Sequence, residues 1–191
     1  ALRLTPETEV DERGRRALTA ARANQAAGEW TRARTIATSL ADAELGALRA
    51  EALIVLAELE SIDGSIALLE GALLAAESSP VLQTEIQIRL ASAVRFREGF
   101  VRAHQRAGAA LELAERLDDD ALRVQALAVL ADLGSGMGDK EARAQAARAI
   151  ELADELGQPR LEHIAADVAW IALEPQAVRQ HLEDEFERWR E

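Results

Sequence analysis

Apolar residues recur every three or four positions along most of the chain, the spacing of one face of an α-helix. Ten such segments follow one another, separated by glycine, proline or acidic residues. Strong helix formers such as Ala, Leu, Glu and Arg dominate, and β-branched residues are scarce. The pattern predicts an all-α protein of ten helices in five antiparallel pairs, which form one helical-repeat domain over residues 1–191. The predicted pairs cover residues 5–42, 46–77, 79–117, 118–156 and 158–190.

Several helix ends are marked by capping residues. Thr5 and Ser79 each precede a proline, and a capping hydroxyl followed by proline is typical of a helix start. The acidic run at residues 118–120 supplies caps for the next helix. The glycines at 134, 136 and 138 predict a turn, and Gly157 with Pro159 beyond it predicts a helix end at residue 156.

One helical unit is written twice in the second half of the chain. Residues 103–117 read AHQRAGAALELAERL and residues 142–156 read ARAQAARAIELADEL, with seven identities at an offset of thirty-nine. A fixed period of this size is typical of stacked helical repeats. The second helices of four pairs also align small residues one turn apart, which allows a neighbouring helix to approach closely. The aligned positions are Ala33/Ala37, Ala67/Gly71, Ala103/Ala107 and Ala142/Ala146.

The turns of this array resemble those of tetratricopeptide repeats. Gly28-Glu29-Trp30-Thr31-Arg32-Ala33 matches the turn and second-helix start of that family, and we expect the Trp30 ring to cover the gap between its two helices. The match is degenerate, because Gly64 and Asp139 stand where the ring belongs in two other pairs. The resemblance implies a right-handed α-solenoid of about five helix pairs, whose first helices line a concave groove.

The chain also resembles the central helical region of large ATP-dependent LuxR-type transcriptional regulators. In that family the region lies between a nucleotide-binding domain and a helix-turn-helix domain, so ATP hydrolysis and DNA reading would lie outside these residues. The first residue, Ala1, fits either loss of the initiator methionine or excision from a longer chain. The residues that carry the resemblance are Leu4-Thr5-Pro6, Arg15-Arg16-Ala17-Leu18, Ala26-Ala27-Gly28, Ala50-Glu51-Ala52-Leu53 and residues 111–117.

Charge and composition exclude several classes of protein. The net charge of −12 repels phosphate backbones, so we expect no direct contact with nucleic acid. The absence of cysteine excludes disulfides and thiolate zinc sites. The longest apolar runs are far too short to span a bilayer, and the N-terminus is charged where a signal peptide is apolar, so we expect a cytoplasmic protein without membrane contact.

No constellation predicts catalysis, a cofactor or a metal. The glycines at 134–138 precede Lys140, but a phosphate-binding loop needs a preceding strand, and here a helix precedes them. His163 and Asp167, and His181 with Asp184 and Glu185, offer helical pairs, whereas a zinc site needs three or four converging ligands. No residue set meets the requirements of an active site, so we expect a protein that is not an enzyme.

Two surfaces are candidates for binding. The predicted fifth helix and the start of the sixth carry a cationic island, defined as Gln83, Gln87, Arg89, Arg95, Arg97 and Arg102, which would suit an acidic peptide or a carboxylate ligand. The alternative is a solvated helix face whose arginines pair with neighbouring glutamates. Near the C-terminus, Leu182, Phe186 and Trp189 form one apolar face, which either caps the last repeat or docks a partner or a second copy in a homodimer.

The leading interpretation is a non-catalytic scaffold or sensor module of a bacterial transcriptional regulator, which binds a protein or peptide. A small-molecule effector domain, with a cavity for an inducer between repeats, is one alternative. A stand-alone tetratricopeptide adaptor is the other.

Overall fold

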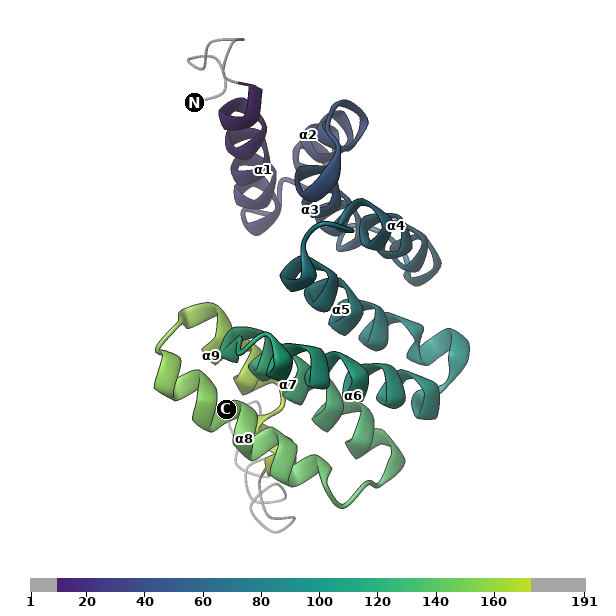
Figure 1. Ribbon diagram of the computed structural model, residues 1–191, viewed down its shortest axis with the longest axis vertical. Helices are drawn as coiled ribbons and strands as arrows, with labels where there is room; N and C mark the ends of the chain where they lie inside the picture. Colours follow the sequence, from purple (N-terminus) through teal and green to yellow (C-terminus); the bar gives the residue numbers. More distant parts are fainter. Residues whose placement is uncertain (1–9, 173–191) are drawn as a thin grey trace, which may run out of the picture. The chain divides into compact units, whose positions relative to one another are not determined.

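The computed structural model describes residues 10–172 (Figure 1), and all regular elements in that range are α-helices. The all-α prediction is therefore confirmed, and successive helices pack against one another from α1 to α4 and from α6 to α10. Within the same range no helix combines the length and the apolar character that crossing a membrane requires. The helices are α1 (Val10–Ala26), α2 (Trp30–Ala43), α3 (Gly46–Ala57), α4 (Ile62–Ala75), α5 (Pro80–Glu98), α6 (Phe100–Arg116), α7 (Asp120–Met137), α8 (Ala142–Leu156), α9 (Pro159–Asp167) and α10 (Ala169–Ala172).

Most helix ends follow the capping residues of the sequence. Helix α5 begins at Pro80, and the Asp119 carboxylate caps α7 by accepting from the Leu122 N–H at 3.0 Å. Helix α8 ends at Leu156, where Gly157 adopts a φ of 58° and donates its N–H to the Ala153 carbonyl. The first helix of the predicted pair 158–190 is not continuous, because it breaks at Val168 into α9 and α10. The predicted start at Thr5 and the part of the predicted pair 158–190 beyond residue 172 lie outside the described residues.

The chain divides into two compact units, Ala1–Ala93 and Val94–Glu191, with the boundary inside α5. Unit 1 holds α1 to α4 and the first part of α5. Helix α1 packs against α2 and α3, and α3 packs against α4. A core forms between α1, α2 and α3, consisting of Leu18, Ala21, Ala37, Leu40, Ala41, Ala52, Val55 and Leu56. The single repeat domain over residues 1–191 stays a prediction.

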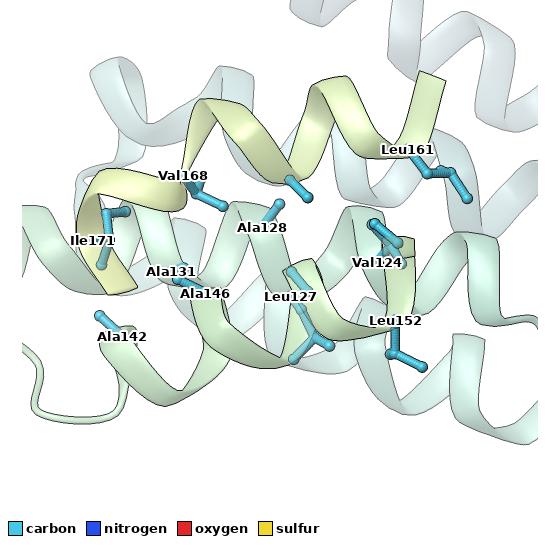
Figure 2. Close-up of a cluster of buried hydrophobic side chains, with 13 residues drawn as sticks. Val124, Leu127, Ala128, Ala131, Ala142, Ala146, Leu152, Leu161, Val168 and Ile171 are labelled. Atoms are coloured by element: carbon cyan, nitrogen blue, oxygen red, sulfur yellow. The ribbon is translucent and has the colours of Figure 1, made fainter. Parts of the chain in front are cut away.

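Unit 2 is organised around α7, which packs against α6, α8 and α9. Consecutive residues such as Leu127–Ala128 and Leu130–Ala131 are buried, so α7 is covered on several sides. Figure 2 shows the main core of this unit, where α7, α8, α9 and α10 meet. Its buried residues include Val124, Leu127, Ala131, Ala146, Leu152, Leu161, Val168 and Ile171.

Burial in unit 2 follows the internal repeat. In α6 the buried residues are Ala103, Ala107, Ala110 and Ala114, and the equivalent Ala142, Ala146, Ala149 and Ala153 of α8 are buried as well. The two copies thus bury the same face, with small side chains that allow a neighbouring backbone to come close.

The predicted register is wrong for α4 in unit 1. Ala67 is exposed, and α4 instead buries Ile66, Leu69 and Ala72, a stripe centred on the opposite side of the helix from the predicted Ala67/Gly71 stripe. Large aliphatic side chains gain more from leaving water than alanine does, so they set the buried face. Trp30 is the first residue of α2 and is 58% exposed, and the covering role of its ring stays a prediction.

Candidate functional site

The six residues of the cationic island lie on α5 and at the start of α6, and the unit boundary at residue 93 separates them into two groups. Gln83, Gln87 and Arg89 belong to unit 1, where all three side chains are half-buried. Arg95, Arg97 and Arg102 belong to unit 2. The two groups have different surroundings, so each is described by itself.

In unit 1 the guanidinium of Arg89 is held by two carboxylates. It pairs with Glu58 at the end of α3 and with Glu85 at 2.9 Å, one turn earlier on α5. Burial lowers the pKa of Arg89, but the charges of Glu58 and Glu85 outweigh it and raise the pKa above its ordinary value. The charge of Arg89 is therefore neutralised inside unit 1, and its role here is to link α5 to α3.

In unit 2 Arg95 links α5 to α7. Its guanidinium donates to the Asp132 carboxylate of α7 and lies 4.8 Å from the centre of the Phe96 ring. A cation over a ring face is attracted by the electron density of the ring. Arg95 thus joins two helices and supports an aromatic ring at the surface.

Arg97 and Arg102 differ from Arg89 and Arg95 in their surroundings. Both side chains are exposed, and neither forms an ion pair with a residue in the described part of the chain. They flank exposed apolar side chains at the turn between α5 and α6, of which Phe96 is 65% and Val101 63% exposed. We define the aromatic-arginine patch as Phe96, Arg97, Phe100, Val101, Arg102 and Met137.

Met137, the last residue of α7, forms one side of this patch. The Phe100 ring lies so close to Gly136 that a Cβ built there would be 2.7 Å from Phe100 Cε1. Glycine at 136 therefore allows the ring of α6 to rest against the last turn of α7, beside the exposed Met137. The apolar members of the patch were missed by sequence analysis, although the run Phe96, Phe100 and Val101 around Gly99 could have indicated them.

The glycine-rich segment after α7 differs from its prediction. Gly134 and Gly136 continue the helix, which ends only at Met137, and Gly138 follows with a φ of 71°. The N–H groups of Gly138 and Asp139 donate to the carbonyls of Ser135 and Gly134 and close the helix end. A cavity of about 420 Å³ lies beside this turn, lined by Ser135, Gly138, Asp139, Lys140, Ala142, Arg143 and Ile171.

Within residues 10–172, no three potential metal ligands converge. His163 and Asp167 are both exposed on α9. His104 of α6 lies with its Nε2 at 3.6 Å from Asp139 Oδ2. The second histidine group, His181 with Asp184 and Glu185, and the apolar face of Leu182, Phe186 and Trp189 lie outside the described residues.

No protein-family model matches the chain, and no curated protein is similar to it at a significant level.

Proposed function

We propose that the chain is a non-catalytic binding module, and that the aromatic-arginine patch docks an acidic peptide segment of a protein partner. The observation that carries the proposal is the gathering of exposed aromatic and arginine side chains within seven residues of one turn, from Phe96 to Arg102. Exposed apolar side chains of monomeric proteins usually lie apart, whereas contiguous ones mark interaction surfaces. Aromatic residues and arginine are also the residue types that carry most binding energy at interfaces.

The charges of the patch favour an acidic partner. The chain as a whole has a net charge of −12, so two arginines without a carboxylate partner among the described residues stand out against an acidic surface. Their guanidinium groups would bind the carboxylates of Asp or Glu with paired hydrogen bonds. Phe96 and Val101 would take an apolar side chain of the same peptide.

The wider interpretation is a right-handed, tetratricopeptide-like solenoid that serves as the sensor region of a LuxR-type regulator. It is supported by the repeated alanine face of α6 and α8 and by the Gly28 turn before α2. An open reading frame with an ATPase segment before these residues and a helix-turn-helix segment after them would support the regulator. Its absence would leave a stand-alone adaptor.

Selection from a displayed library of random peptides tests the docking proposal. The wild-type chain should enrich peptides that place Asp or Glu beside an aromatic or aliphatic residue. The double variant Arg97→Glu with Arg102→Glu should fail to enrich them, and affinity for a selected peptide should fall with rising salt because exposed charges are screened. The variant avoids Arg95, because a glutamate at 95 would face Asp132 and disturb the packing of α5 on α7.

The matched control makes the same change of charge in unit 1. Arg32→Glu with Arg49→Glu alters two exposed arginines on α2 and α3, and it should leave peptide enrichment unchanged. Equal losses in both double variants would reject the patch as the docking site, since they would show an effect of net charge alone. Enrichment of peptides without acidic residues would reject the acidic partner.

A further inference from the structure

The cavity beside the α7–α8 turn is a second feature of unit 2 and shares no lining residue with the aromatic-arginine patch. It is bounded by the last turn of α7, the turn itself, the first turn of α8 and α10. Its volume of about 420 Å³ lies within the range of cavities that hold small organic molecules.

The floor of the cavity is apolar. Ala142 and Ile171 are both buried members of the unit 2 core, and Figure 2 shows them next to each other where α8 begins and α10 passes. Contact with these two side chains would favour a ligand with a hydrocarbon or aromatic portion. A simple inorganic anion would leave this surface unused.

The rim of the cavity is polar and carries positive charge. Ser135 offers a hydroxyl, and Lys140 is exposed and forms no ion pair with a residue in the described part of the chain. Arg143 also lines the cavity and adds positive charge to the rim, and it already interacts with another group of the protein. The Asp139 carboxylate is partly occupied, because its Oδ1 accepts from the Glu141 N–H at 3.0 Å.

Recognition at this rim would come from side chains. The N–H groups of Gly138 and Asp139, which a phosphate cradle would need, are used to close the end of α7. Among the lining side chains, the Lys140 ammonium and the Ser135 hydroxyl offer donors to a ligand above a floor of apolar side chains.

We propose that this cavity binds a small organic carboxylate, with the carboxylate at Lys140 and Ser135 and the apolar portion on Ala142 and Ile171. This site goes beyond the peptide-docking function and does not depend on it. A small-molecule site in the same unit as the docking patch would allow one chain to respond to a metabolite as well as to a protein.

Amide chemical shifts of the full chain, titrated with benzoate and separately with benzamide, test the proposal. The two probes share a ring and a similar size, but only benzoate carries a charge. Benzoate should produce saturable shifts in the amides of residues 135–143 and Ile171, and benzamide should bind more weakly. Absence of saturable shifts at these residues, or equal binding of benzamide, would overturn the proposal.

Two charge-reversal variants distinguish binding at Lys140 from a general effect of net charge on benzoate binding. Lys140→Glu should weaken benzoate binding by about tenfold, because an attraction becomes a repulsion. Arg116→Glu, at an exposed position of α6 in the same unit, makes the same change of charge and should have little effect. Equal effects of the two variants would count against a site at Lys140. Arg97→Glu with Arg102→Glu should leave benzoate binding intact, so failure of the peptide proposal and failure of this one are distinguishable.

Discussion

Helix α4 of unit 1 and helix α8 of unit 2 hold corresponding places in the repeat, but they bury different kinds of side chain. Helix α4 buries Ile66, Leu69 and Ala72, whereas the buried face of α8 consists of four alanines and Leu152. In α8 the bulky partners come from α7, whose Val124 and Leu127 lie in the same core. The comparison shows that the second helix of one pair can be stabilised by its own large side chains and that of another pair by the large side chains of the neighbouring helix.

The largest expected effect comes from removing a large side chain in α4. Ile66→Ala should lower the free energy of unfolding by about 2–5 kcal/mol, because Ile66 is 1% exposed and its loss leaves a cavity. Ile62→Ala is the matched control, since Ile62 lies on the same helix and is 46% exposed. Urea unfolding followed by circular dichroism measures both. Similar losses for the two variants would contradict the burial of α4 through Ile66.

Enlarging a buried alanine of α8 tests its buried face, which we call the alanine seam and which consists of Ala142, Ala146, Ala149 and Ala153. Ala146→Leu should destabilise the chain by roughly 1–3 kcal/mol, because three added carbon atoms have no room between α7 and α8. Ala67→Leu places the same side chain at the exposed position of α4 and should change stability by no more than about 0.5 kcal/mol. A shift of the urea midpoint without a change in slope is the expected measurement. If Ala67→Leu proved the more damaging, the register of α4 would be the one predicted from sequence.

Helix caps provide a smaller contrast between the units. Asp119 caps α7 through its side chain, whereas Glu29 at the corresponding place before α2 makes no side-chain cap bond. Asp119→Ala should therefore cost about 1 kcal/mol, while Asp119→Asn should retain most of the stability. Glu29→Ala should leave the thermal unfolding midpoint almost unchanged. A loss at Glu29 equal to that at Asp119 would show that the caps differ less than their geometry indicates.

The sequence was a good guide wherever local chemistry decides the structure. The start of α5 at Pro80, the cap at Asp119 and the end of α8 at Gly157 depend on residues within one turn of the feature. The duplicated alanine face was also predictable, because the same alanine spacing occurs in both copies. Both copies pack against α7. The register of α4 was not, since it depends on whether Ile66 or Ala67 meets the neighbouring helix.

The candidate site was harder to predict for the same reason. The sequence located the arginines of α5 and α6, and Glu85 lies within one turn of Arg89. The other carboxylates that bind Arg89 and Arg95, Glu58 and Asp132, lie 31 and 37 residues away. Only the folded chain shows that these two arginines are paired while Arg97 and Arg102 are exposed. The apolar side of the patch depends likewise on the contact between Phe100 and Gly136, which joins two helices.

Glycines inside helices allow the finest comparison of packing in the two units. Gly71 of α4 and Gly108 of α6 have room for a methyl group, because the nearest atom to a Cβ at 71 is Leu53 Cδ1 at 3.7 Å and none lies within 4 Å at 108. Gly71→Ala and Gly108→Ala should each raise the free energy of unfolding by about 0.4–1 kcal/mol, since alanine restricts the unfolded chain.

Gly134 of α7 is the matched test. A Cβ there would lie 3.2 Å from the Cβ of Ala142 and 3.3 Å from that of Asp139, and neither atom can move unless its backbone moves. Gly134→Ala should therefore not raise the free energy of unfolding as Gly71→Ala and Gly108→Ala are expected to do. If Gly134→Ala raised the free energy of unfolding as much as the other two variants, α8 would lie farther from α7 than its buried alanines indicate. The contrast between α4 and α8 would then be weaker.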